Sequence, residues 1–192
     1  VKTRRRAAAR LVRFAECTWV EARAHARHRR TVVLLPLGAL EEHGPHLPLL
    51  VDWLGAEELA RRLAPHLARA GWRPLLAPSL PYGVSPLAER WPGTVSLSEP
   101  TLSRLVVEIV RGLAGHGFRR FVLTNYQADP AHLRAIATAG TALPAAGDLD
   151  ASFGAGGRAI VDTGADEDTT ALALQAANDL NITFVVDEEQ GD

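Results

Sequence analysis

The stretch "TVVLLPLGALEEHGPHLPLLVD", residues 31–52, joins an apolar run to a polar loop, and this junction indicates the fold class. Residues 31–37 are almost continuously apolar and rich in β-branched side chains, which is typical of a strand covered on both faces of a sheet. The loop that follows carries carboxylates, histidines and prolines before the sequence turns apolar again. In parallel sheets, ligands gather at this end of the strands.

The rest of the chain alternates apolar runs with segments of helical spacing. Leucines recur close to helical spacing between Asp52 and Gly71, where the glycine is expected to end the helix. Ser98 can cap the clearest helix, and Pro100 suits its first turn. This alternation predicts an α/β layered domain with a mostly parallel sheet. The expected strands are 31–37, 119–125, 156–164 and 181–187, with 73–83 as a strand running into a proline-rich loop, and the expected helices are 52–71, 98–118, 129–140 and 166–179.

Composition and length fit one domain. The chain has 192 residues, 47% of them hydrophobic, which is enough to bury a core. Cys17 is the single cysteine, so no intramolecular disulfide can form, and a reducing cytoplasm fits. The longest apolar run is shorter than a membrane span, and the N-terminus lacks the apolar segment of a signal peptide. We therefore expect a cytoplasmic protein with no membrane partner.

The charge is unevenly distributed along the chain. The net charge of −1 gives no argument for a polyanionic partner across the whole surface. The first thirty residues are rich in arginine, which could form a nucleic-acid patch, but a solvated Arg/Ala helix is the favoured interpretation. We expect a basic extension at 1–14, an α/β domain at 15–186 and a loose acidic tail at 187–192.

The polar loop offers a possible metal site. Glu41 and His43 are two residues apart, so both side chains could point the same way on an extended segment, and Asp52 follows after a loop. Carboxylate and imidazole ligands suit zinc, manganese or iron(II), and a carboxylate can bridge two metals. The alternative is a polar turn whose side chains only cap a helix and bond the loop. The stretch "LTNYQADP", residues 123–130, ends another strand and raises the same question.

Several segments, in order, resemble the creatininase family of creatinine amidohydrolases and related cyclic-amide and formamide hydrolases. The most specific is the "E-x-HGPHLP…D" motif within residues 36–52, followed by "PGT-SL" within residues 80–98. Further similarity lies in "TW" at 18–19 and in "HGFRRFVLTN" at 116–125. The resemblance implies a three-layer α/β/α domain, commonly a homohexamer, and a two-metal site that activates water against a C–N amide bond.

The resemblance also implies roles for individual residues. Glu41 would bind one metal, His43 the other, and Asp52 would bridge both. His46 would contact these ligands rather than a metal and assist catalysis. The family's next ligand is a histidine, and Gln127 stands at its position as a neutral and weaker ligand.

Two further positions depart from the family pattern. Asp129 stands two residues after Gln127 and is either a metal ligand with a catalytic role or the cap of the following helix. Asp168 stands where the resemblance implies a catalytic glutamate, and Thr163 replaces a histidine expected to transfer protons. Where a histidine transfers the proton, its loss typically costs about 10²–10⁴-fold in rate.

These observations lead to two functional hypotheses. The first is a divergent hydrolase with one or two Zn, Mn or Fe ions, acting on a small amide, lactam or formamide, with a single metal on His43, Asp52 and Asp129 as the fallback. The second is a catalytically degenerate member that serves as a scaffold or partner subunit. A homo-oligomer, up to a hexamer, is expected from the resemblance, and nucleic-acid binding is the weakest alternative.

Overall fold

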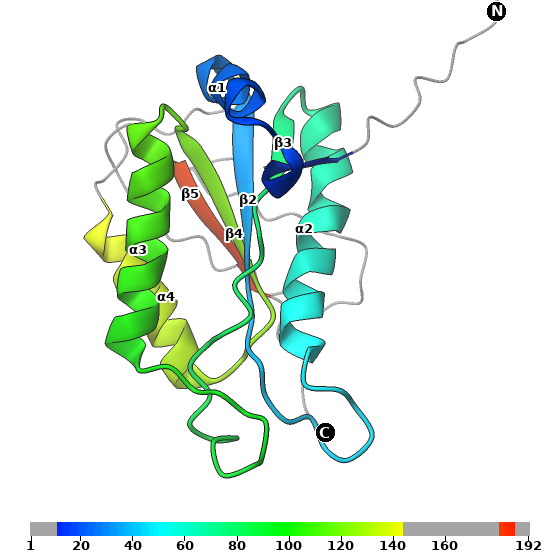
Figure 1. Cartoon of the computed structure of the whole chain (residues 1–192), viewed down its shortest axis with the longest axis vertical. Helices are drawn as coiled ribbons and strands as arrows, with labels where there is room; N and C mark the ends of the chain where they lie inside the picture. Colours follow the sequence, from blue (N-terminus) through cyan, green and yellow to red (C-terminus); the bar gives the residue numbers. More distant parts are fainter. Residues whose placement is uncertain (1–10, 144–180, 187–192) are drawn as a thin grey trace, which may run out of the picture.

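The computed structural model describes residues 11–143 and 181–186, and its centre is a parallel sheet (Figure 1). Among the described residues, the sheet has five strands in the order β1-β3-β2-β4-β5, and each strand runs parallel to its neighbours. The strands are β1 (Val12–Arg13), β2 (Thr31–Leu37), β3 (Arg73–Leu76), β4 (Arg120–Asn125) and β5 (Asn181–Val186).

Helices cover both faces of this sheet. On one face, α2 packs against β2, β3 and β4 through a core that includes Val32, Leu34 and Leu63. On the other face, α3 and α4 pack against the sheet and against each other, around Val33, Leu35 and other buried residues. The helices are α1 (Trp19–Arg27), α2 (Val51–Arg69), α3 (Glu99–Gly115) and α4 (Pro130–Ala142), with a short 3₁₀ helix, η1 (Phe14–Glu16). The predicted α/β/α layering around a parallel sheet is therefore confirmed.

Local sequence explains where the elements begin. All residues of β2 are buried, as its continuous apolar run predicts for a central strand. The Ser98 side chain accepts a hydrogen bond from the Thr101 backbone N–H at the start of α3, and Pro100 lies in that first turn. Thr18 and Glu21 form a reciprocal capping box at the start of α1.

Some predicted elements differ in extent or lie outside the described residues. Strand β3 covers Arg73–Leu76 and is followed by a proline-rich segment that is not a strand, in agreement with the prediction for 73–83. The sheet begins at Val12, within the segment predicted as an N-terminal extension. The strand predicted at 156–164, the helix at 166–179 and the acidic tail lie outside the described residues. Within the described ranges, no helix has the length and apolar character needed to cross a bilayer.

The topology brings the two polar loops together. In the register of β2 with β4, Leu37 is paired with Asn125, and each is the last residue of its strand. Parallel strands end at the same edge of a sheet, so the loop after β2 and the loop after β4 leave side by side. This edge therefore carries the residues that the sequence singled out.

Candidate metal centre

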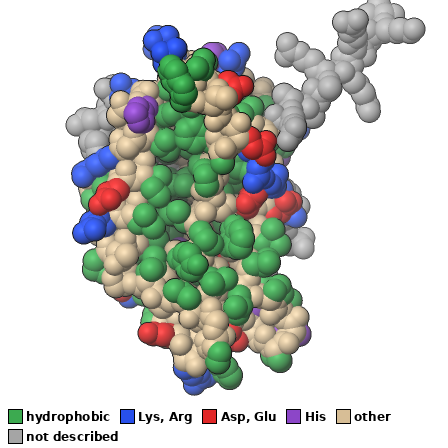
Figure 2. Space-filling model, in the orientation of Figure 1, with side chains coloured by type: hydrophobic (Ala, Val, Ile, Leu, Met, Phe, Trp, Pro, Cys, Tyr) green, Lys and Arg blue, Asp and Glu red, His purple; other side chains and the backbone are tan. Residues whose placement is uncertain are grey.

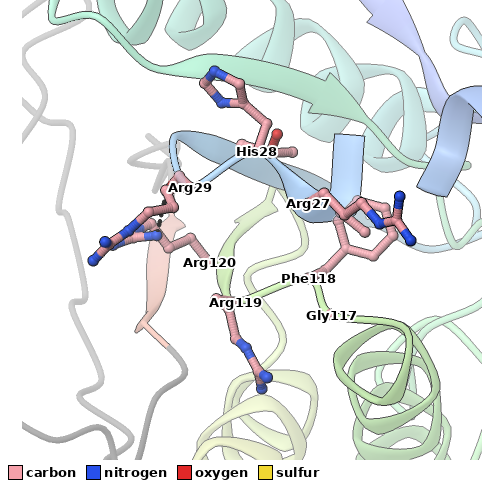
Figure 3. Close-up of a pocket in the computed structure, with 9 residues that line it drawn as sticks. Arg27, His28, Arg29, Gly117, Phe118, Arg119 and Arg120 are labelled. Carbon is pink, nitrogen blue, oxygen red and sulfur yellow. Dashed lines mark hydrogen bonds between the residues drawn. The ribbon is translucent and has the colours of Figure 1, made fainter. Parts of the chain in front are cut away.

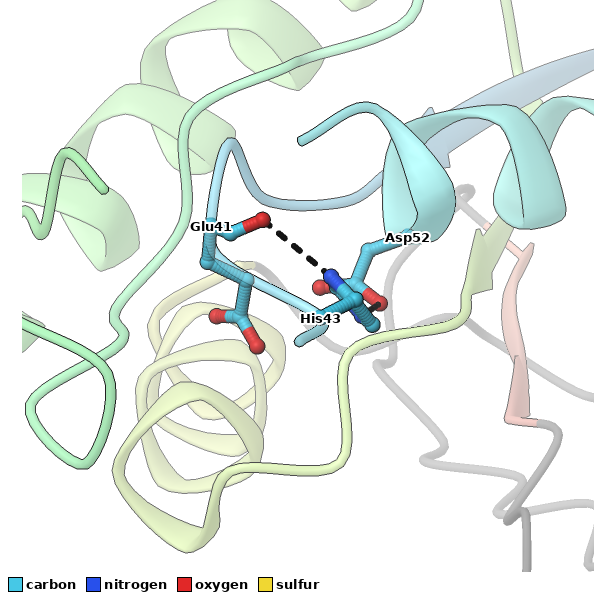
Figure 4. Close-up of side chains that lie close together, drawn as sticks. All are labelled: Glu41, His43 and Asp52. Atoms are coloured by element: carbon cyan, nitrogen blue, oxygen red, sulfur yellow. Dashed lines mark hydrogen bonds and ion pairs between the residues drawn. The ribbon is translucent and has the colours of Figure 1, made fainter. Parts of the chain in front are cut away.

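The loop after β2 gathers three ligand-type side chains at the start of α2 (Figure 4). One ligand atom from each of Glu41, His43 and Asp52 lies within 4.8 Å of the others. Asp52 lies in the first turn of α2 and is only 4% exposed, so its carboxylate is buried where the helix N-terminus favours negative charge. Gly38 permits this packing, because a Cβ there would lie 2.4 Å from the Trp53 backbone.

The contacts of His43 determine what its ring can do. Its Nδ1 lies 3.1 Å from the Glu41 carbonyl oxygen, which can only accept, so Nδ1 carries the proton in this bond. Its Nε2 then faces Asp52 Oδ1 at 3.0 Å. This contact is an ion pair when both ring nitrogens carry protons, and a divalent cation bound to Nε2 and Oδ1 would take the place of the Nε2 proton. A backbone carbonyl on one ring nitrogen and a carboxylate beside the other is also the arrangement that orients metal-binding histidines.

The loop after β4 contributes an amide rather than an imidazole. Gln127 is buried, and its Nε2 donates to the Glu41 carboxylate through Oε2 and to Ser85 Oγ at 3.0 Å. Its Oε1 accepts from the Asp129 backbone N–H at 2.9 Å. The two loops are thus joined by a hydrogen bond from Gln127 to one of the predicted metal ligands.

The remaining predicted site residues lie outside the three-residue group. Asp129 caps α4, because its Oδ1 accepts from the Ala131 backbone N–H at 2.8 Å. Asp129 Oδ2 is buried and has no hydrogen-bond partner among the described residues. His46 is exposed, and Asp168 lies outside the described residues. The geometry therefore brings together Glu41, His43 and Asp52, with Gln127 beside them.

Comparison with known proteins places the chain in a family. Residues 15–181 match the creatininase family, which is described as creatinine amidohydrolase. The chain belongs to the creatininase family. A creatinine amidohydrolase from Pseudomonas putida is 39% identical over 115 residues, which cover 57% of this chain and 42% of that protein. A mycofactocin precursor peptide peptidase from Mycobacterium ulcerans is 32% identical over 157 residues, covering 79% of this chain and 60% of that protein.

Solved structures of creatininases share the fold. A mutant creatininase described as "Zn-Zn type" aligns with a TM-score of 0.56 and 38% identity, covering 68% of this chain and 52% of that chain. A structure described as "Creatininase Mn" aligns with a TM-score of 0.56 and 38% identity, covering 67% of this chain and 51% of that chain. The chain therefore spans about half the length of these creatininases.

Two residues that support the site, Ser85 and His132, are not among the site residues predicted from the sequence. Ser85 accepts one N–H of Gln127, and nothing in its local sequence marked it as part of the site. His132, in α4, is fully buried, and its Nδ1 accepts from the Val84 backbone N–H at 3.1 Å. Burial lowers the pKa of His132 to about 4, so its ring is neutral at pH 7. His132 thereby fixes the segment that carries Ser85.

A cavity lies at the other end of the sheet, where β2 and β4 begin (Figure 3). It has a volume of about 430 Å³ and is formed by residues that precede or begin β2 and β4, including Arg27, Arg29, Arg119 and Arg120. The Arg120 guanidinium donates to the Arg29 carbonyl at 2.6 Å and lies 4.9 Å from the centre of the Trp72 ring. The arginines that line this cavity therefore lie at the end of the sheet opposite the Glu41–His43–Asp52 group.

Proposed function

We propose that this chain is a metal-dependent amidohydrolase whose divalent ion is held by Glu41, His43 and Asp52. The observation that carries the proposal is the convergence of these three ligand atoms within 4.8 Å in a member of the creatininase family. Two carboxylates and one imidazole form a donor set suited to zinc or manganese, and also to iron(II).

The immediate surroundings support this donor set. The Glu41 carbonyl holds the His43 ring so that Nε2 is directed toward Asp52 Oδ1. Asp52 is anchored in the first turn of α2, and the Gln127 amide holds the Glu41 carboxylate. Such outer hydrogen bonds typically contribute about 10–100-fold to metal affinity. We assign Asp129 to the cap of α4 rather than to the metal, because it lies outside the group in which the three ligand atoms converge.

The proposed reaction is hydrolysis of an amide C–N bond. A divalent ion at this site would polarise the amide carbonyl and lower the pKa of water. The chain's own contribution is to fix the three ligands on the rigid edge of the sheet, next to the ends of β2 and β4. The named relatives are a creatinine amidohydrolase and a peptide peptidase, both of which cleave C–N bonds. We propose a small amide, lactam or formamide as the substrate.

An activity assay tests this proposal directly. Purified protein would be stripped of metal and reloaded separately with Zn²⁺, Mn²⁺ or Fe²⁺. Formamides, lactams and other small amides would then be supplied as substrates, and the amine released by hydrolysis would be measured. We expect turnover that depends on the added ion and is lost in Asp52→Asn, while Glu42→Gln, a matched change at a neighbouring carboxylate outside the group, retains it. Turnover that is equal with and without metal would contradict the proposal.

A catalytically degenerate family member is the second candidate, and the Gln127 contact favours it. A neutral amide now donates to a carboxylate that the family resemblance assigns to a metal. If the group had lost its ion, the chain could act as a scaffold or partner subunit. Elemental analysis of protein purified without chelator separates the two candidates. Fewer than about one ion per four chains, with no recovery on adding Mn²⁺ or Zn²⁺, would favour the degenerate member.

We also propose that the protein is a cytoplasmic homo-oligomer, up to a hexamer. Figure 2 shows hydrophobic side chains gathered over the middle of one face, with charged side chains toward its edges. Several large apolar side chains are exposed in the described part of the chain, including Trp19 at 71% and Leu87 at 76%. Apolar surface of this kind marks association sites. Light scattering coupled to size-exclusion chromatography tests the proposal, and a strictly monomeric mass at micromolar concentration would contradict it.

A further inference from the structure

The Gln127 side chain has an orientation that its contacts determine. Its Oε1 accepts from the Asp129 backbone N–H, which can only donate. The other amide atom must therefore be the nitrogen, and it donates to two oxygens, Glu41 Oε2 and Ser85 Oγ. Reversing the amide would place a carbonyl oxygen against the Glu41 carboxylate and an NH₂ group against a backbone N–H. The hydrogen-bond network thus excludes the reversed amide.

This orientation has a consequence for Glu41. One oxygen of its carboxylate is occupied by the N–H of Gln127, so the positive end of an amide dipole lies where a cation on that oxygen would lie. The carboxylate has a second oxygen, and one oxygen of Glu41 belongs to the group formed with His43 and Asp52. The Gln127 oxygen is not available as a ligand either, because it is held by the Asp129 N–H. Both atoms of the Gln127 amide are therefore directed to protein groups.

We propose that the site binds one divalent ion per chain, and that Gln127 is a positioning residue that takes the place of a second ion by holding Glu41. The three ligands of the single ion are Glu41, His43 and Asp52, on the side of the loop after β2. The inference rests on the proposed function, because it assumes that the group binds metal. It adds the number of ions and the role of Gln127, whose amide ties the two loops together through Glu41 and Ser85.

Calorimetric titration of metal-free protein with Zn²⁺ and with Mn²⁺ tests this inference through stoichiometry and affinity. Wild-type protein is expected to bind one ion per chain. Gln127→Leu removes both N–H donors at similar size, and we expect one ion bound about 10–100-fold more weakly, the typical effect of losing an outer hydrogen bond on a ligand. Gln127→His replaces the donors with an imidazole and is expected to raise the stoichiometry to two ions per chain.

Controls separate this effect from a loss of folding. Ser85→Ala removes the other acceptor of the Gln127 amide but leaves its bond to Glu41, so we expect one ion with an affinity within about threefold of wild type. Thermal unfolding of each metal-free variant shows that the fold is retained. If Gln127→Leu does not fold, the stoichiometries of wild type and Gln127→His still decide the question.

The outcomes distinguish this inference from the proposed function. Two ions per wild-type chain would overturn the inference while leaving the metal-dependent hydrolase intact. Wild-type affinity in Gln127→Leu would also overturn it, because Glu41 would then not depend on the amide. No binding by wild-type protein would overturn the proposed function itself. One ion in wild type, weaker binding in Gln127→Leu and two ions in Gln127→His would support the inference.

Discussion

The loops after β2 and β4 leave the sheet as neighbours, because Leu37 is paired with Asn125, yet they present different chemistry to the space between them. The loop after β2 supplies Glu41 and His43, and the first turn of α2 supplies Asp52; the ligand atoms of these three residues converge. The loop after β4 supplies Gln127, whose amide bonds to Glu41, and Asp129, whose carboxylate caps α4. In the proposed function, the first loop and the start of α2 would bind a cation, and the second loop would hold the first.

This difference shows how one residue type can change a shared site without changing the fold. An imidazole offers a lone pair to a metal, whereas an amide held through its oxygen offers only N–H donors. The register of β2 with β4 pairs Leu37 with Asn125, and the cap of α4 is made by Asp129, so neither is formed by the Gln127 side chain itself. A family scaffold can therefore keep one half of a site while the other half takes a supporting role.

The largest expected effect is at Asp52, in the first turn of α2 that follows the loop after β2. Asp52→Asn keeps the size of the side chain but removes the charge that faces His43 Nε2 at 3.0 Å. We expect metal affinity to fall by more than about 100-fold, because a direct ligand matters more than the outer contacts whose loss costs about 10–100-fold. Calorimetric titration measures this, with Glu42→Gln as the matched control. Unchanged affinity in Asp52→Asn would remove the loop after β2 from the metal site.

A second prediction concerns His132 of α4, the helix that follows the loop after β4. Its ring accepts a hydrogen bond from the Val84 backbone N–H. Its pKa is lowered by burial from 6.5 to about 4, so the unfolded chain binds a proton on this group at pH values where the folded chain does not. The stability that this neutral ring provides is present above pH 6.5 and is lost progressively as the pH falls toward 4. Between pH 7 and pH 5, we expect a loss of about 2 kcal/mol from this group alone.

His132→Asn isolates that contribution, because asparagine does not titrate and can still offer an acceptor to the Val84 N–H. Urea unfolding at pH 7 and pH 5 gives the change in the free energy of unfolding for both proteins. The wild type should lose about 2 kcal/mol more than the variant over this interval. Equal losses would mean that the His132 ring is not held neutral in the folded chain.

A third prediction separates the two roles considered for Asp129. Asp129→Ala removes the cap of α4, and loss of such a cap typically costs about 1 kcal/mol of stability. Metal affinity should stay within about threefold of wild type, since Asp129 is outside the converging group. Asp129→Asn keeps a capping oxygen and serves as the control. A large loss of metal affinity in both variants would make Asp129 a ligand and extend the metal site to the loop after β4.

The smallest expected effect is at the basic cavity on the opposite edge of the sheet. Replacing Arg27 and Arg119 by glutamate changes two exposed charges that line this cavity and lie apart from Glu41, His43 and Asp52. Metal affinity should be unchanged within about twofold at 0.15 M salt, since exposed charges beyond a Debye length of about 8 Å are largely screened. Calorimetric titration checks this. A larger change would show that the two edges are coupled.

The sequence predicted the features that depend on local pattern. The buried run of β2, the caps of α3 and α4, and the grouping of Glu41, His43 and Asp52 follow from residue type and spacing along short segments. β1 is only two residues long, Val12–Arg13, and so carries no detectable strand pattern. By contrast, the Thr18–Glu21 capping box follows the local spacing T-x-x-E, which predicts the start of a helix.

The contacts of the loop after β4 could not be predicted in the same way. The bond between Gln127 and Ser85 joins residues 42 positions apart, and it depends on which end of an amide faces which loop. Local sequence pattern also does not predict where the ring of Tyr126 lies. It packs on Gly55 of α2, where a Cβ would come within 2.4 Å of the ring. Such features arise from tertiary packing rather than from local pattern.

The central claim is that the loop after β2 binds the metal and the loop after β4 supports it. The most direct test is an anomalous-diffraction map collected at the zinc absorption edge from crystals of the zinc-loaded protein. The account predicts one peak per chain, in contact with Glu41, His43 and Asp52, with Gln127 still bonded to the Glu41 carboxylate. A peak coordinated by Gln127 or Asp129, or no peak near these residues, would contradict it.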